Sequence, residues 1–290
     1  MRLLLLCSTL LLAACQSLPP LPDWQSPDGL DHQTIGQILD LRTGQHISPV
    51  QLVDRLAREE RVLIGERHDN PDHHALQLWL IRALAERRQH GSVLLEMIEP
   101  GQQERVAAVQ RRILQGQHPD DLPAALAWQK GWPWALYGEL VTYSLAQQAP
   151  LLPANLEGDE IATIYRNPPS LSGAAAQQQV QTMLLEQIRV SHCNMLPEAQ
   201  LPAMLAVQQQ RDRRMAQKLA AAPVPALLLA GGFHVRRDVG VPLHLADQPG
   251  KPAAVVLLLA EVGAAVSDNQ ADYAWFTPAQ PEQDHCRQFR

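Results

Sequence analysis

Residues 62–77 read VLIGERHDNPDHHALQ, and this stretch decides the class of fold. A short apolar run at 61–65 leads into Glu66, Arg67 and His68, and Asn70-Pro71 follows closely. Asn is a preferred N-cap residue and Pro is favoured in the first turn of a helix, so a helix is predicted to begin here. A buried strand followed so closely by a helix is typical of a βα unit in a parallel sheet.

The same alternation of short apolar runs and amphipathic segments continues along the chain. Further strands are predicted at 92–98, 150–157, 223–234 and 253–262, with helical segments between them. Connections through helices make a sheet mostly parallel and cover both of its faces. The sequence therefore predicts a single α/β domain over 46–290, with a mostly parallel central sheet and helices on both faces. Residues 100–150 and 160–222 would form a helical cap or insertion.

Polar side chains stand at the carboxyl ends of four predicted strands. Glu66 and His68 follow the first strand, Glu96 ends the second, Asn155 ends the third and His234 ends the fourth. The carboxyl ends of parallel strands meet at one edge, where open α/β sheets bind ligands. Two of these ends share the pattern Gly-x-x-His, in which Gly lets the backbone turn or approach a ligand closely. We therefore expect these side chains to form one wall of a pocket.

This set of residues suits more than one chemistry. Two His and two carboxylates, namely Glu66, His68, Glu96 and His234, suit a divalent cation, with a carboxylate as general base on a bound water. Either His could instead bind haem iron or a haem propionate. In the purely structural alternative, His68 caps the Asp-Asn-Pro turn and His234 is a hydrogen-bonded residue at a helix start. The residues alone leave the choice between haem and metal open.

His73 and His74 differ in kind, because they fall in the first turn of the predicted helix. Adjacent residues on a helix point in different directions, so at most one of them can face the sheet edge. We expect both to belong to a solvated helix start.

The N-terminus has the pattern of a secretory signal peptide, with one Arg and an apolar run too short to span a bilayer. Residues 12–15 read LAAC and resemble a bacterial lipobox, so cleavage after residue 14 would leave Cys15 as a lipidated, palmitate-bearing terminus. An ordinary signal peptide that contains a Cys is the alternative. The Pro-rich residues that follow predict an extended tether over 15–45. Gln16 in place of Asp is typical of lipoproteins sorted to the outer membrane.

Composition narrows the partners of the chain. The 290 residues carry a formal net charge of -6 without a long basic run, which argues against nucleic acid as the main partner. Once Cys7 is removed with the signal peptide and Cys15 is lipidated, Cys193 and Cys286 remain. Outside the cytoplasm these two could pair as a disulfide that ties the C-terminal tail to the body, or could stay free.

Several motifs together resemble the ChaN-like family of haem-uptake lipoproteins, which is related more distantly to the Tiki and erythromycin-esterase proteins. The motifs are LIGERHDNPDHHALQ (63–77), VLLEM (93–97), GWPWALY (131–137), PANLE (153–157), SHCNMLPEAQLP (191–202), QQQRDRRMAQKL (208–219) and LLAGGFHVRRDVGVPLHL (228–245). They cover about residues 50–260, and Arg67 and the Gln run at 208–210 depart from the family pattern. The resemblance implies an α/β fold with a helical region and a haem-binding surface, in a homodimer that would sandwich haem.

The resemblance also suggests which side chains would hold haem, because extracytoplasmic uptake proteins often bind ferric haem through Tyr. The mature chain has four tyrosines, Tyr137, Tyr143, Tyr165 and Tyr273. Tyr137 is favoured, since it lies in GWPWALY beside Trp132 and Trp134, which would flank a porphyrin; burial in the core is the competing explanation. Arg211 and Arg214 lie one turn apart on a predicted helix and would pair with the propionates, or would form a solvated charged face.

We therefore expect a lipid-anchored protein of the bacterial cell envelope that is not an enzyme. It would hold haem at the periplasmic face of the outer membrane, with His68 and His234 at the binding surface, and would work with other haem-uptake proteins. The alternative is a metal-dependent hydrolase of the Tiki or erythromycin-esterase type that uses the Glu and His set.

Overall fold

A central eight-stranded sheet organises the residues that the computed structural model describes, which are 18–170, 172–281 and 286. Its strands are β1 (Ile38–Asp40), β2 (Gln45–Ile47), β3 (Arg61–Glu66), β4 (Ser92–Leu95), β5 (Leu151–Pro153), β6 (Ala226–Gly231), β7 (Val255–Glu261) and β8 (Tyr273–Thr277). Their order across the sheet is β2-β1-β8-β7-β3-β6-β4-β5. All neighbours from β8 to β5 are parallel, and β1 and β2 add an antiparallel edge. The predicted α/β class with a mostly parallel sheet is confirmed.

The five predicted strands are present as β3 to β7, but β4 to β7 are shorter than the apolar runs that predicted them. β4 ends at Leu95, while Met97 and Ile98 are buried in the turn that follows it. Burial alone therefore does not mark the end of a strand. β1, β2 and β8 were not predicted, because β1 and β2 have three residues each and β8 has five, too few for a clear pattern.

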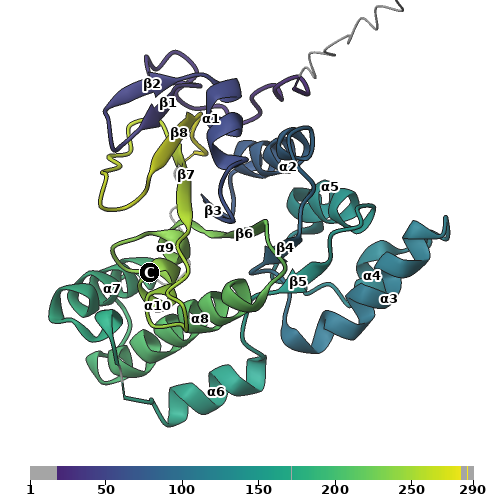
Figure 1. The fold of residues 1–290 in the computed structure, drawn as a ribbon. Helices are drawn as coiled ribbons and strands as arrows, with labels where there is room; N and C mark the ends of the chain where they lie inside the picture. The colour runs from purple at the N-terminus through teal and green to yellow at the C-terminus, as the bar shows by residue number, and fades with distance from the viewer. Residues whose placement is uncertain (1–17, 171, 282–285, 287–290) are drawn as a thin grey trace, which may run out of the picture.

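Helices cover both faces of the sheet, as predicted (Figure 1). They are α1 (Pro49–Leu56), α2 (Pro71–Ala85), α3 (Gln103–Leu114), α4 (Leu122–Leu126), α5 (Trp134–Leu145), α6 (Gly158–Arg166), α7 (Gln178–Ser191), α8 (Leu201–Ala221), α9 (Gly232–Val235) and α10 (Val241–Leu245). Three short 3-10 helices, η1 (Pro100–Gln102), η2 (Ala174–Ala176) and η3 (Glu198–Gln200), also lie in the described part of the chain.

Alternation along the strands divides the core into two layers. Val62 and Ile64 of β3 pack with α1, α2 and α5 on one face, whereas Leu63 packs with α8 and α10 on the other. A third apolar cluster joins α7 to the N-terminal half of α8, away from the sheet. Burial of each such Leu or Ile contributes about 1.5–3 kcal/mol. The third cluster makes α7 and α8 the helical region that extends past the sheet.

The predicted start of α2 is confirmed. Pro71 is its first residue, and the Asn70 side chain accepts hydrogen bonds from the backbone amides of Asp72 and His73. The Asn70 amide group also donates to Glu261 (2.9 Å) and to the Pro278 carbonyl (3.0 Å), so this cap links the helix to the end of the sheet.

Residues 18–45 are not the free tether that the sequence predicts. The backbone amides of Gln25 and Ser26 donate to the Asp72 carboxylate at 2.7 and 2.9 Å. The Trp79 indole donates to the Pro19 carbonyl at 2.9 Å, and β1 belongs to the sheet. A Pro-rich segment without regular structure can still pack through its backbone groups, so the folded body begins by Leu18. Residues 1–17, which include the signal peptide and Cys15, lie outside the described residues.

Cys193 and Cys286 are paired as a disulfide, with their Cα atoms 5.5 Å apart. The bond joins the C-terminal tail to the corner between α7 and α8, and so decides between the two alternatives that the sequence left open. Within the described residues, no helix has the length and the apolar composition needed to cross a bilayer.

Candidate functional site

The structure brings the predicted polar residues together at the carboxyl edge of the sheet. Glu66 at the end of β3 is the register partner of Gly231 at the end of β6. Glu96 follows β4 and accepts a hydrogen bond from the Gly231 amide (2.8 Å), and His234 lies in α9, directly after β6. Asn155 acts as a support, because its amide group donates to the Glu96 carbonyl at 2.9 Å.

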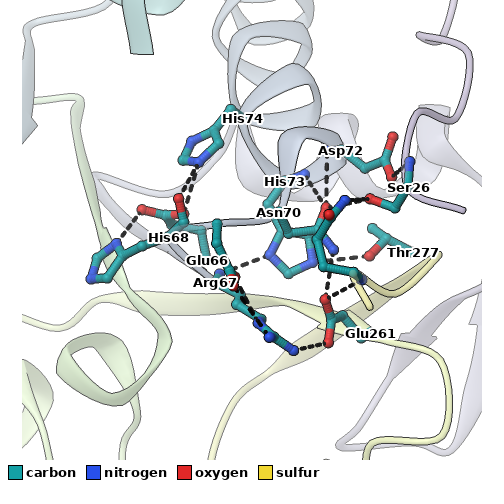
Figure 2. A network of polar contacts seen from close by, with 12 residues as sticks. Ser26, Glu66, Arg67, His68, Asn70, Asp72, His73, His74, Glu261 and Thr277 are labelled. Carbon is teal, nitrogen blue, oxygen red and sulfur yellow. Dashed lines mark hydrogen bonds and ion pairs between the residues drawn. The ribbon is translucent and has the colours of Figure 1, made fainter. Parts of the chain in front are cut away.

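The first half of the site is a His–carboxylate pair that is open to one side. His68 Nδ1 lies 2.8 Å from Glu66 Oε1, which also accepts from the Tyr137 hydroxyl at 3.1 Å (Figure 2 shows the His68–Glu66 pair). The Glu66 side chain is fully buried, whereas that of His68 is 44% exposed. Burial opposes protonation of His68, but the hydrogen bond to Glu66 and the charge of Glu96 outweigh it and raise the pKa of His68.

The second half is a buried imidazole between two carboxylates. His234 Nδ1 lies 2.5 Å from Asp212 Oδ1, and His234 Nε2 lies 3.3 Å from Glu96 Oε1. Burial alone would lower the pKa of His234, but the charges of Glu96 and Asp212 and the hydrogen bonds to them raise it to about 10. Burial raises the pKa of Asp212 to about 6, against the pull of His234, while His234 keeps the pKa of Glu96 below its usual range despite burial. His234 is therefore an imidazolium at neutral pH.

Gly231 explains how the two halves come so close. A Cβ atom at this position would lie 2.8 Å from His68 Nε2 and 2.9 Å from His68 Cε1, so the imidazole occupies the space of the missing side chain. Gly65 is equally confined, because a Cβ there would lie 2.3 Å from Val235 Cγ2. The glycines of both Gly-x-x-His patterns therefore permit close approach, as the sequence suggested.

His73 and His74 are both buried, so the expected solvated helix start is wrong. His73 Nδ1 accepts from the Arg67 amide (2.8 Å) and its Nε2 donates to the Thr277 hydroxyl (2.9 Å; Figure 2). Burial, with the charges of His74 and Arg67, lowers the pKa of His73 to about 3. His74 packs edge-on against the Tyr137 ring (4.4 Å between centroids), and its Nε2 lies 3.0 Å from the His68 carbonyl. Both therefore form the support behind Glu66 and His68.

A cavity of about 1050 Å³ lies in front of this edge. Its floor includes Glu66, His68, Gly231 and His234. Its walls are mostly apolar, with Ile161 and Tyr165 from α6, Leu184 and Ile188 from α7, Met204 and Val207 from α8, and Ala264 to Val266 beyond β7. Four arginines also line it, namely Arg67, Arg166, Arg211 and Arg236.

Two residues expected at the haem surface lie elsewhere. Tyr137 is fully buried, does not line the cavity and donates its hydroxyl to Glu66. Burial and the charge of Glu66 raise its pKa far above the usual range, which disfavours the phenolate that binds ferric iron. Arg214 is held by Glu160 at 2.6 and 3.2 Å and lines a separate, smaller cavity. Core packing and an ion pair therefore account for these two side chains, while Arg211 does reach the large cavity.

The divalent-metal alternative finds no support in the described part of the chain, where no group of three or more His, Cys, Asp or Glu is placed to hold a cation. Each carboxylate that would have served as a ligand already accepts hydrogen bonds from its own neighbours. Glu66 faces His68 and Tyr137, and Glu96 faces Gly231 and His234.

The parallel sheet, the polar residues at its carboxyl edge and the cavity in front of them are typical of an α/β protein that binds a ligand where the parallel strands end. A family model described as haem-binding uptake, Tiki superfamily, ChaN matches residues 52–245. The chain belongs to this family. The predicted resemblance is confirmed.

One solved structure supports the same family. The structure described as "Cofacial heme binding to ChaN of Campylobacter jejuni" has a TM-score of 0.75 and 30% sequence identity, over 82% of this chain and 95% of that one. An erythromycin esterase mutant in its open conformation has a TM-score of 0.45 and 14% identity, over 82% of this chain and 81% of that one. No curated protein sequence matches the chain significantly.

Proposed function

We propose that this protein binds haem in the cavity at the carboxyl edge of the sheet. The single observation that carries the proposal is the cavity itself, which combines apolar walls, a tyrosine and four arginines in about 1050 Å³. This volume lies slightly above the usual range for small-molecule sites, which is about 300–1,000 Å³. Haem has an apolar macrocycle and two anionic propionates, so it matches such a lining. Membership of the haem-binding uptake family supports the same ligand.

Tyr165 is the axial ligand in this proposal. Of the four tyrosines, all of which are described, Tyr165 is the one that lines the cavity. The Tyr137 hydroxyl is engaged with Glu66 and that of Tyr273 accepts from Arg42, whereas no hydrogen bond to the Tyr165 hydroxyl is present among the described residues. A half-buried phenol without a partner is available to iron, as tyrosinate is in catalases.

Arg211 is the main partner for a propionate. It lines the cavity, and its Nε atom is buried without a hydrogen-bond partner among the described residues. A buried donor left without an acceptor is costly, so an incoming carboxylate would satisfy it. Arg236 also lines the cavity, although Asp238 already pairs with it at 2.6 Å.

The pattern of the N-terminal sequence supports a proposal for the cellular role. We propose that Cys15 is lipidated and anchors the domain at the periplasmic face of the outer membrane, where it passes haem to or from other uptake proteins. Since the body begins by Leu18, such an anchor would hold the folded domain close to the membrane. Haem binding to the ChaN protein of Campylobacter jejuni is described as cofacial, which supports a homodimer of this chain that places two haems face to face.

The test is a titration of the mature chain from Gln16 with haemin, followed by Soret absorbance. We expect saturable binding with a shifted Soret band. Tyr165→Phe should change the spectrum and weaken binding at least about tenfold, or about 1.4 kcal/mol. Tyr143→Phe removes a hydroxyl from a half-buried tyrosine outside the cavity and should change neither.

Two outcomes would contradict the proposal in different ways. An unchanged Soret band in the wild-type chain would reject haem as the ligand. A normal spectrum in Tyr165→Phe, together with a lost one in Tyr137→Phe, would keep haem and move the ligand to the tyrosine that the sequence favoured.

A metal-free acid/base activity is the second candidate, and the exposure of His68 favours it. An imidazole open to a cavity and oriented by a buried carboxylate, here Glu66, is the arrangement of a general acid or base. The test is hydrolysis of chromogenic esters in the presence of a chelator. Activity that is lost in His68→Ala would support this candidate, and equal slow rates in both chains would remove it.

A further inference from the structure

Helix α6 is packed differently from the other helices around the cavity. None of its nine residues is buried, whereas α7 buries Val180, Leu184 and Ile188. Its apolar residues Ile161 and Tyr165 are one turn apart and face the large cavity instead of a core. Figure 1 shows α6 at the margin of the molecule, alongside α8. The apolar face of α6 therefore gains cover only when a ligand fills the cavity.

The attachments of α6 are concentrated at its first turn. The Glu157 carboxylate accepts from the Gly101 amide, and its backbone amide donates to Glu160 Oε2 at 2.9 Å in a capping box. Glu160 also pairs with Arg214 of α8 through two contacts, at 2.6 and 3.2 Å. Beyond Glu160, the side-chain hydrogen bonds of α6 within the described residues stay inside the helix, from Thr163 to Asp159 and from Arg166 to Ala162. Within the described residues, the C-terminal half of α6, which carries Tyr165, is therefore fixed through the contacts of the first turn of the helix.

We propose that Glu160 and Arg214 are positioning residues for the haem site, because their ion pair fixes α6 and with it the Tyr165 hydroxyl over the cavity. This inference rests on the proposed haem function and adds a control point to it. When the ion pair is broken, α6 moves more freely about its first turn, and haem dissociates faster. The side chains that contact haem stay the same.

The position of the pair separates this effect from direct contact with haem. Glu160 and Arg214 do not line the large cavity; they line a second one of about 350 Å³ on the other side of α6. The hydrogen bonds to Arg214 lower the pKa of Glu160, so the pair is ionised at neutral pH. A substitution of Glu160 therefore reaches haem through the position of α6 and not through direct contact.

The experiment compares the rate of haemin release from the wild-type mature chain and from Glu160→Gln, measured by transfer to an excess of an apo-haemoprotein. Gln keeps an oxygen for the Glu157 amide and so preserves the capping box, while it removes the charge. We expect release about three- to tenfold faster with an unchanged Soret maximum. Arg214→Met should act alike, and the double variant should be no faster than either single variant, because both remove one interaction.

Exchanging the two charges, with Glu160→Arg and Arg214→Glu in one chain, should restore part of the slow release, because it restores the ion pair but not the hydrogen bond from the Glu157 amide. Arg87→Gln is the matched control, since it breaks the Arg87–Asp54 pair (2.8 Å) between α1 and α2, away from the cavity. That variant should release haemin at the wild-type rate.

Hydrogen exchange of the amides of residues 161–166 in the ligand-free chain tests the same idea without haem. Faster exchange in Glu160→Gln than in the wild type is expected. Unchanged exchange together with unchanged release would overturn the positioning role and leave haem binding intact. A wild-type chain that binds no haemin would overturn the proposed function and this inference with it, whatever the exchange rates show.

Discussion

The buried His234 imidazolium makes a specific prediction about stability above neutral pH. Its pKa is about 10 in the folded chain, against about 6.5 for an unperturbed His. A group whose folded pKa is raised contributes stability that is fully present below the unfolded pKa and is lost as pH rises through the folded one. The stabilising contribution of His234 therefore falls with rising pH between about pH 6.5 and about pH 10.

The magnitude follows from the protons that each state holds. Between pH 7 and pH 9, folded His234 keeps its proton while the unfolded residue has released most of it. One proton of difference changes the free energy of unfolding by about 1.4 kcal/mol per pH unit. We expect a loss of about 2 kcal/mol over this range. Asp212, whose raised pKa is about 6, changes stability with pH mainly below this range. His68, whose pKa is also raised, changes stability in the same direction as His234.

The assay is urea unfolding at pH 7, 8 and 9, for the wild type and for a chain with Asp212→Asn and His234→Gln together. The double variant should be less stable at pH 7 but should lose less stability between pH 7 and 9. An NMR titration of the imidazoles in the wild type gives the same answer without a substitution. If His234 titrates near pH 6.5, or if wild-type stability is flat from pH 7 to 9, the reasoning is refuted.

Two more predictions concern the support of the site. Gly231→Ala places a methyl group against His68 and should turn the imidazole away from Glu66, so that an NMR titration finds a lower His68 pKa; an unchanged pKa would show that the glycine is not needed for this contact. Asn70→Ala should cost about 2–4 kcal/mol in urea unfolding, because it removes a cap and buried hydrogen bonds. Asp121→Ala, which removes the exposed cap of α4, is the control and should cost about 1 kcal/mol or less. Similar losses in both would mean that the buried bonds of Asn70 add nothing.

The location of the site could be predicted because it depends on periodicity and topology. Buried parallel strands appear in a sequence as short apolar runs, and the residue after each run must lie at the carboxyl edge. Glu66, Glu96 and His234 were found in this way. Which side chains pair at this edge depends on contacts between elements that are far apart in the sequence. The sequence therefore did not show that His234 pairs with Asp212 instead of binding a metal.

Asp212 was missed because its neighbours Arg211, Arg213 and Arg214 make the segment look solvated. A signal was nevertheless present. Asp212 is spaced at helical intervals from Met215, Ala216 and Leu219, all of which are buried in α8. A carboxylate in an apolar stripe needs a partner, and His234 supplies it.

The burial of His73 and His74 was missed for a related reason. α2 is buried on nearly all sides, so even its first turn has no solvated face. That fact depends on the N-terminal segment and on β8, which pack around the start of α2 and could not be placed from sequence. Tyr165 was also passed over, because nothing in its local sequence shows that α6 faces a cavity.

The most direct measurement is a crystal structure of the mature chain loaded with haemin. The account predicts a porphyrin between α6 and the Gly231 edge, with the Tyr165 oxygen on iron and a propionate at Arg211. Haem bound elsewhere on the chain, or a cavity that stays free of haem at saturating haemin, would contradict it.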